Sequence, residues 1–340
     1  MIQVDAAPGG QVFRTAIGLA SLTGKEIEIV NIRSDRPNPG LRAQHLTALE
    51  TVAGMCNATI NGASKGSGTV NFLPGKLKET ALKVNIGTAG SATLLLQSAM
   101  FPSLKTETKL RVTGGTDVEW SPPFAYMGLV LLPILNSIGC NFSAELIKRG
   151  YYPKGKGIIS FKSSPAKLPL KPLNITEKGD IEIIKIFSHC ASLATDVARN
   201  QMIAAKKELR NLNVDFSECV AAKENIDTIG SGIDLFAHLS SGQIIGANAL
   251  GKKGFPANEV GKKAAKNLLS ELGKERPVDK HLADQLIPFM ALAKGNSEIT
   301  CTEITAHTEN NISVCEKILG VKFSIEKEEG IISVEGMAFK

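Results

Sequence analysis

Several features of membrane-spanning, secreted and disulfide-linked proteins are missing from this sequence. Its strongest apolar stretch, Met127 to Leu135, is far shorter than the roughly 18 residues that cross a bilayer. The amino-terminal residues MIQVDAAPGG have neither the basic nor the apolar part of a signal peptide. Its 6 cysteines include no Cys-x-x-Cys pair, which argues against a disulfide framework or a zinc site. We therefore predict a cytoplasmic protein without membrane contact.

Motifs of the common nucleotide-binding and hydrolytic enzymes are also missing. The chain has no Gly-x-x-x-x-Gly-Lys-Ser/Thr loop, no kinase signature and no Gly-x-Ser-x-Gly elbow, so any use of ATP would not involve a P-loop. The net charge of +6 suits a polyanionic ligand but also suits many enzymes of small metabolites. The acid-free basic stretch 148–171 is compatible with a solvated loop or with an RNA-backbone contact.

An internal repeat is the most informative feature that is present. Three times the chain runs from a polar loop through an apolar helix to an alternating strand, then through a second loop and helix to short strands. The first helices of the three repeats are predicted at 11–22, 91–100 and 281–293, and the second helices at 41–54, 124–139 and 312–320. This order predicts three β-α-β-α-β-β units, each a sheet covered by helices.

The stretch from about 180 to 273 breaks the repeat. It contains a predicted helix at 188–209, strand-like segments at 214–221, 232–240 and 242–250, and a Lys-rich amphipathic helix at 257–272. We therefore expect an α/β (α+β) protein in which residues 1–179 and 274–340 form one large domain of three units. Residues 180–273 are expected to form a smaller α/β domain inserted between the second and third units.

Strand-to-helix loops at equivalent places in the units should meet at one end of the molecule, where ligands commonly bind. The first of these loops carries Arg33, Arg36 and Arg42, whose guanidinium groups could clamp phosphates; the alternative is a solvated cationic loop. Arg14 lies in an apolar helix and needs a counter-charge or a ligand. The third loop carries His307 at a strand end, which favours a catalytic role, together with Asn310 and Asn311; the second carries Thr116 and Asp117.

Six segments, in order, resemble the signature blocks of the RNA 3'-terminal phosphate cyclase family. They are NIRSDRPNPGLRAQHLTAL, GTAGSATLLLQ, VTGGTDVEWSPP, RGYYPKGKG, HLADQLIPFMALA and TAHTENNI. The resemblance implies three repeated α/β units with an inserted domain, and an enzyme that uses ATP and a divalent metal, Mg²⁺ or Mn²⁺. In that family a histidine takes up AMP and passes it to an RNA 3'-phosphate. The neighbouring 2'-OH then attacks this phosphate and closes a 2',3'-cyclic phosphate. RNA 3' ends and ATP are the implied partners, and a homodimer is left open.

The same resemblance assigns roles to particular residues. His307 matches the nucleophile; Gln97, Asp284 and Gln285 match positions near the nucleotide, and Asp284 could instead orient the histidine or approach the metal. The phosphate-side positions are matched by Gln11, Arg14, Arg33, Arg36 and Arg42. The metal ligands are not identified by any match.

The chain departs from the family pattern in its first loop. That loop usually resembles Asp-Gly-x-x-Gly-Glu-Gly-Gly-Gly-Gln, whereas here Asp5 is followed by Ala6-Ala7-Pro8-Gly9-Gly10-Gln11, without the glutamate. Ala125 also replaces a usual acid, and Lys156 interrupts a glycine run. These changes favour the main alternative, a cyclase-like RNA-binding protein of ribosome biogenesis, whereas the retained His307 speaks against it. An enolpyruvyl transferase, which shares repeated α/β units, is a third interpretation.

Overall fold

The computed structural model describes residues 1–223 and 227–340. Its first unit contains β1 (Ile2–Asp5), α1 (Gly10–Thr23), β2 (Ile27–Val30), α2 (Ala43–Cys56), β3 (Thr59–Asn61) and β4 (Val70–Leu73). The strands are ordered β1-β2-β4-β3, with β1 parallel to β2 and the other two pairs antiparallel. Helix α2 begins two residues later than the pattern indicated, after Arg42, whose extended backbone ends the arginine loop.

The second unit repeats this arrangement. Its elements are β5 (Thr80–Asn85), α3 (Ala92–Met100), β6 (Thr108–Gly114), α4 (Phe124–Tyr126), α5 (Leu132–Ser137), β7 (Phe142–Lys148) and β8 (Gly157–Ser163). The strand order is β5-β6-β8-β7, again with one parallel pair. The predicted helix 124–139 is interrupted by a π-helical turn, Met127–Leu131, just before Pro133. Proline has no N–H to donate to the preceding turn, which accounts for the irregular hydrogen bonding.

The third unit has the same topology but is split in sequence. It contains β9 (Asn174–Ile175), α8 (Lys280–Leu292), β14 (Lys294–Thr300), α9 (Ala306–Leu319), β15 (Phe323–Glu326) and β16 (Ile331–Met337), with strand order β15-β16-β14-β9. Strand β9 pairs in parallel with β14 although the inserted segment separates them. The insertion therefore falls inside the third unit rather than before it. A two-residue strand is too short to show an alternating pattern, so the sequence did not reveal it. The prediction of three β-α-β-α-β-β units is confirmed.

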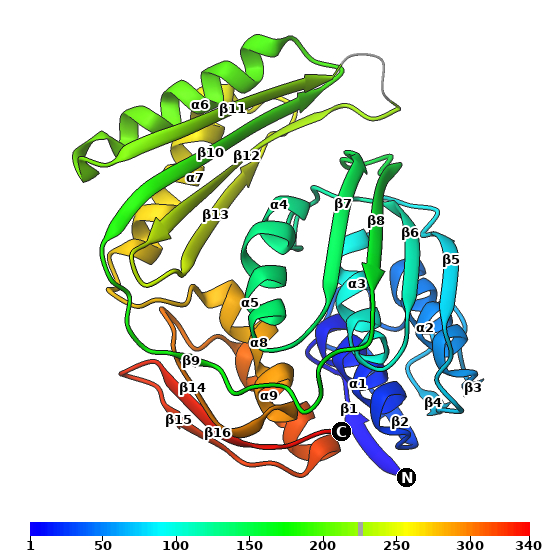
Figure 1. Cartoon of the computed structure of the whole chain (residues 1–340). Helices are drawn as coiled ribbons and strands as arrows, with labels where there is room; N and C mark the ends of the chain where they lie inside the picture. Colours follow the sequence, from blue (N-terminus) through cyan, green and yellow to red (C-terminus); the bar gives the residue numbers. More distant parts are fainter. Residues whose placement is uncertain (224–226) are drawn as a thin grey trace.

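The inserted segment forms a fourth sheet with two helices (Figure 1). Its elements are β10 (Ile181–Ala191), α6 (Thr195–Leu209), β11 (Asp215–Lys223), β12 (Gly230–Leu239), β13 (Ile244–Leu250) and α7 (Ala257–Leu272). The predicted helix start at Ser188 is wrong, because Ser188–Ala191 pair with both β11 and β12 and stay extended. The predicted bounds of α7 are confirmed. The domain boundaries at 180 and 273 stay a prediction.

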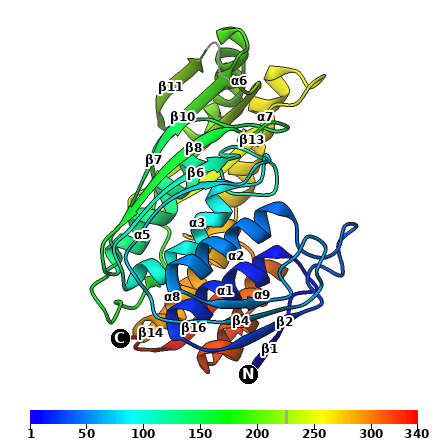
Figure 2. The ribbon, with the colours of Figure 1, turned by 90° about the vertical axis from the view of Figure 1, so that its right-hand side faces the viewer.

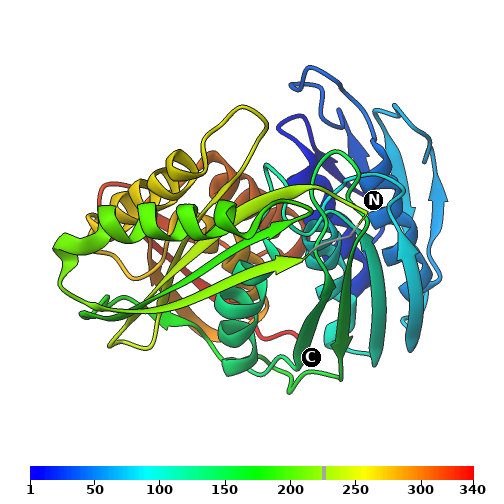
Figure 3. The same ribbon diagram turned by 90° about the horizontal axis from the view of Figure 1, so that it is seen from above.

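The helices of the three units meet in the centre of the molecule, and their sheets lie outside (Figure 2). Helix α1 contacts α2, α3 and α9, and nearly every residue from Val12 to Leu22 is buried. Gly18 permits the close approach, because a Cβ there would lie 2.9 Å from the Ser98 carbonyl oxygen. Seen from above, the inserted sheet covers one end of this assembly (Figure 3). Side chains from α1, α8 and α9 can therefore reach one another although they are far apart in sequence.

Candidate active site

A cavity of about 630 Å³ opens where α1, α3, α8 and α9 meet the inserted segment. The loop of residues 118–123 forms one wall, and residues of β13 and α7 form another. Several of the predicted site residues line this cavity, namely Gln11, Arg14, Gln97, Asp284, Gln285 and His307. The structure thus brings together residues from all three units, but most of them lie on the first helices α1, α3 and α8 rather than on the loops that the repeat predicted to meet.

His307 is the second residue of α9 (Ala306–Leu319). The prediction that it lies in a loop before a helix beginning at residue 312 is therefore wrong. The helix begins earlier because Thr305 caps it, its side-chain oxygen accepting a hydrogen bond from the Thr308 N–H at 3.3 Å. This places the imidazole beside the positive end of the helix dipole, a position that favours anions such as phosphate.

A chain of hydrogen bonds fixes the imidazole. Gln11 Nε2 donates to Asp284 Oδ2 at 2.9 Å, and Gln11 Oε1 lies 2.6 Å from His307 Nδ1. An amide oxygen only accepts, so Nδ1 carries the proton and Nε2 keeps its lone pair. Burial, followed by the charges of Arg36, Arg14 and His281, lowers the pKa of His307. The side chain is therefore neutral near pH 7 and has a free nitrogen.

Arg14 and Asp284 form the charged interior of the site. Within residues 1–223 and 227–340, the Arg14 guanidinium makes no ion pair or hydrogen bond. Burial lowers its pKa to about 10, partly offset by the charge of Asp284. Burial raises the pKa of Asp284 to about 7, opposed by Arg14 and Gln11 and assisted by Asp279. A half-buried guanidinium without a direct partner is costly, which suits a group that receives an anionic ligand.

The three arginines of the first loop are not equivalent. Arg33 Nη1 donates to the carbonyl oxygens of Asn38 and Gly40 at 2.6 and 2.9 Å and so holds the loop in shape. Arg42 precedes α2, and its N–H donates to His45 Nδ1 at 3.2 Å. Neither residue lines the cavity. Arg36 does not line the cavity either. Its Nε donates to the Pro8 carbonyl at 2.9 Å, and after burial its charge is the next cause that lowers the pKa of His307.

Gln97 on α3 and Gln285 on α8, the residue after Asp284, lie in contact with each other. Gln97 Nε2 donates to Gln285 Oε1 at 2.6 Å, and Gln285 Nε2 donates to the His281 carbonyl at 2.5 Å. These contacts join α3 to α8 across the cavity wall. Both side chains line the cavity.

Asn311 was among the loop residues that the sequence singled out, whereas Thr15 and the cavity residues of the inserted segment escaped sequence reasoning. Asn311 Nδ2 donates to the Asp284 carbonyl at 2.7 Å and Thr15 Oγ1 donates to Asn311 Oδ1 at 2.9 Å, so these two residues fix α8 and α1 against α9. The inserted segment contributes Asn248, Lys263 and Asn267 to the cavity lining. The only available signal was the polar face of the Lys-rich helix, where Lys263 and Asn267 are one turn apart.

Thr116 and Asp117 do not join His307 as expected. Asp117 is buried and accepts hydrogen bonds from Thr116 Oγ1 at 2.6 Å and from Arg149 Nη1 at 2.7 Å. It faces the inserted segment instead. The continuation of this loop, which includes the 95% exposed Trp120, lines the cavity.

Comparison with known proteins identifies the class to which this fold and site belong. The sequence model of the family described as "RNA 3'-terminal phosphate cyclase" matches residues 6–325. Among curated proteins, that of Methanosarcina acetivorans named "RNA 3'-terminal phosphate cyclase" is 42% identical, over 98% of this chain and 99% of its own length. Those of the same name from Pyrobaculum aerophilum and Pyrococcus furiosus are 40% and 42% identical, covering 97% and 96% of this chain and 96% and 95% of their own. The chain belongs to the RNA 3'-terminal phosphate cyclase family.

A solved structure, that of the enolpyruvyl transferase NikO from Streptomyces tendae, aligns with 99% of this chain and 81% of its own. Its TM-score is 0.27 at 11% sequence identity, too low to support an enolpyruvyl transferase interpretation. Separately, none of the described helices is both long and apolar enough to cross a membrane.

Proposed function

We propose that this protein uses ATP to convert an RNA 3'-terminal phosphate to a 2',3'-cyclic phosphate through a covalent His307–AMP intermediate. One observation carries the proposal: the neutral His307, with Nδ1 hydrogen-bonded to Gln11, presents an unprotonated Nε2 at the cavity. The names of the relatives agree with the cyclase activity. The adenylated intermediate rests on the site geometry and the family resemblance.

The chemistry divides into three displacements at phosphorus. First, His307 Nε2 attacks the α-phosphate of ATP, so an N–P bond forms, the α–β P–O bond breaks and pyrophosphate leaves. Next, an oxygen of the RNA 3'-phosphate attacks the AMP phosphorus and the N–P bond breaks, which returns the lone pair to Nε2. Finally, the ribose 2'-OH loses its proton and attacks the 3'-phosphate, which closes the ring and expels AMP.

Each neighbouring residue has a physical role in these steps. Gln11 holds the tautomer of His307 by accepting from Nδ1. Arg14, half-buried and without a direct partner, stabilises the charge that accumulates on the transferring phosphate. Gln97 and Gln285 lie on the cavity wall toward the nucleotide. Arg36 keeps the imidazole neutral through its charge, while Arg33 and Arg42 act indirectly by shaping the loop and the start of α2.

A divalent ion also fits the residues of this cavity. Its wall includes two carboxylates, Asp284 and Glu119, and Mg²⁺ is normally held by one or two carboxylates together with substrate phosphates. When bound, such an ion would neutralise phosphate charge. With the glutamate absent from the first loop, Asp284 is a half-buried carboxylate that Gln11 connects to His307 by hydrogen bonds.

The main alternative is a family member that binds RNA without adenylation, which the shortened first loop favours. Incubation with α-³²P-ATP and Mg²⁺ or Mn²⁺ decides between the two. We expect an acid-labile, base-stable protein–AMP adduct in the wild type and none in His307→Ala. Absence of the adduct from folded wild-type protein with either metal would favour the RNA-binding function.

A further inference from the structure

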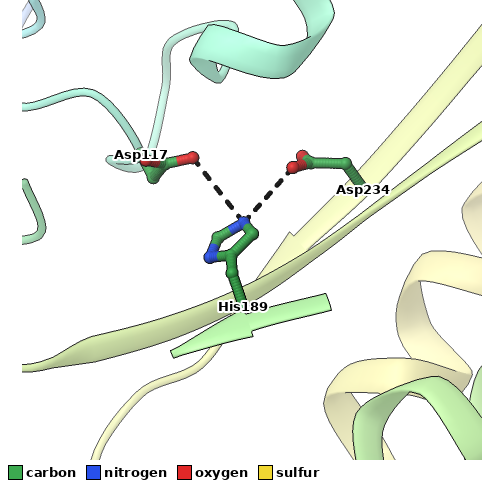
Figure 4. Close-up of side chains that lie close together, drawn as sticks. All are labelled: Asp117, His189 and Asp234. Carbon is green, nitrogen blue, oxygen red and sulfur yellow. Dashed lines mark hydrogen bonds and ion pairs between the residues drawn. The ribbon is translucent and has the colours of Figure 1, made fainter. Parts of the chain in front are cut away.

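A second cluster of buried ionisable groups lies between the second unit and the inserted segment, apart from the cavity lining (Figure 4). His189 on β10 directs Nε2 toward Asp117 Oδ1 at 3.7 Å and Asp234 Oδ2 at 3.2 Å. One donor atom from each residue lies within 4.8 Å of the others. The three side chains are at most 2% exposed.

The spacing of these atoms suits a shared cation. Zn²⁺ binds imidazole nitrogen and carboxylate oxygen at about 2.0–2.2 Å, so ligand atoms around it are roughly 3–4 Å apart. The separations of 3.2 and 3.7 Å fall in this range. Gly232, which pairs with His189 across the sheet, leaves the imidazole uncrowded, because a Cβ there would lie 2.7 Å from Cε1 and 3.2 Å from Nε2.

The charges of the cluster also favour a cation. Asp117 and Asp234 carry two negative charges in a buried place, and Arg149, whose Nη1 lies 2.7 Å from Asp117 Oδ1, offsets one of them. The two carboxylates exceed this one guanidinium by one negative charge. An uncompensated buried charge is expensive, so the site gains from a positive ion.

Surrounding groups already hold two of the three side chains, His189 and Asp117, in place as an outer shell does around a metal. The Tyr151 hydroxyl lies 2.6 Å from His189 Nδ1, and Thr116 Oγ1 donates to Asp117 Oδ2 at 2.6 Å. The hydroxyl oxygen of Tyr151 can accept a hydrogen bond from the Nδ1–H group, which frees Nε2 to bind a cation. Asp117 Oδ1 has a second lone pair beside the one that accepts from Arg149.

We propose that Asp117, His189 and Asp234 form a binding site for a transition-metal dication, Zn²⁺ or Mn²⁺, that links the inserted segment to the second unit. Two carboxylates and one imidazole form a donor set typical of these ions, whereas Mg²⁺ prefers oxygen ligands alone. The bound ion joins β10 and β12 to the loop whose continuation, residues 118–123, lines the cavity. The site is independent of the proposed adenylation, since His307 contributes nothing to it.

Equilibrium dialysis and calorimetry with Zn²⁺, on the full chain without nucleotide, test the proposal. We expect one equivalent bound by the wild type and at least about tenfold weaker binding by Asp234→Asn, which keeps the side-chain shape. His238→Gln, a change on the same strand, should bind like the wild type. Cys219→Ser should also bind like the wild type, which excludes capture of Zn²⁺ by the exposed thiol.

Co²⁺ absorption adds a direct view of the ligands. Binding at this site should give visible d–d bands without a thiolate charge-transfer band, and these bands should be lost in His189→Gln. If circular dichroism shows that Asp234→Asn is misfolded, His189→Gln serves as the test variant instead. Failure of the wild type to bind one equivalent, or equal affinity in a folded variant, overturns the proposal. His307→Ala should retain Zn²⁺ binding, which separates this result from the adenylation test.

Discussion

The three-unit body and the inserted segment use the same parts in different ways. Each of their sheets has one parallel and two antiparallel strand pairs, yet the order is β1-β2-β4-β3 in the first unit and β11-β10-β12-β13 in the insert. The body packs helices of three different sheets against one another, whereas α6 and α7 pack against each other and on a single sheet, around a separate buried cluster.

The body and the inserted segment contribute different kinds of residue to the cavity. Helix α1 is buried almost all round, so Arg14 on it lies in a low-dielectric interior with a lowered pKa. Helix α7 is amphipathic, and its polar residues Lys263 and Asn267 reach the cavity from the side of the insert. The body therefore supplies groups with shifted pKa values, and the insert supplies ordinary polar contacts.

The largest expected effect comes from the body. His307→Ala should lower the rate of protein–AMP formation by about 10³-fold or more, because the attacking nitrogen is removed. The measurement is single-turnover labelling with α-³²P-ATP. His238→Gln in the insert serves as the matched control and should label at the wild-type rate. Equal loss of labelling in both variants would contradict a special role for His307.

The next effect tests whether residues 180–273 form a separate domain, as we propose. Leu268→Ala in the insert and Leu286→Ala in the body each remove a fully buried side chain, at a cost of about 2–5 kcal/mol. Hydrogen exchange should then speed up within 181–272 for Leu268→Ala and within the helices of the body for Leu286→Ala. A uniform increase throughout the chain in both variants would show a single cooperative unit.

The raised pKa of Asp284 should make the free energy of unfolding decrease as the pH rises. Its pKa is raised to about 7 in the folded protein, above the ordinary value near 3.9, so the folded state binds more protons between these values. The free energy of unfolding should therefore decrease from about pH 4 to about pH 7. Asp284→Asn should flatten this slope and be more stable at pH 8, by up to about 4 kcal/mol. Denaturant unfolding at several pH values measures this free energy for both proteins. The same pH dependence in Asp284→Asn as in the wild type would refute the prediction.

The smallest effect concerns the pH dependence of adenylation. The neutral imidazole attacks, and the pKa of His307 is lowered, so labelling should persist below the ordinary histidine value of about 6.5. Arg36→Gln removes one of the charges that lower this pKa, so the acid limb should move to higher pH by less than about one unit. Lys178→Gln, remote from His307, should leave the limb in place. A shift to lower pH in Arg36→Gln would be inconsistent with this account.

The sequence by itself determined the repeated units, the bounds of α7, and the family. Periodicity of apolar residues is a local property, so the helices and longer strands could be predicted from it. The ordered motifs, including the one around His307, carried the family resemblance.

Only the tertiary structure decided which residues meet. Strand β9 became visible through its pairing with β14 across the insert, and Ser188–Ala191 stayed extended because two neighbouring strands bind them. The same holds for the chain from His307 through Gln11 to Asp284, and for the Asp117, His189 and Asp234 cluster. Burial and long-range contacts set pKa values and hydrogen-bond partners, and neither is a property of a local stretch of residues.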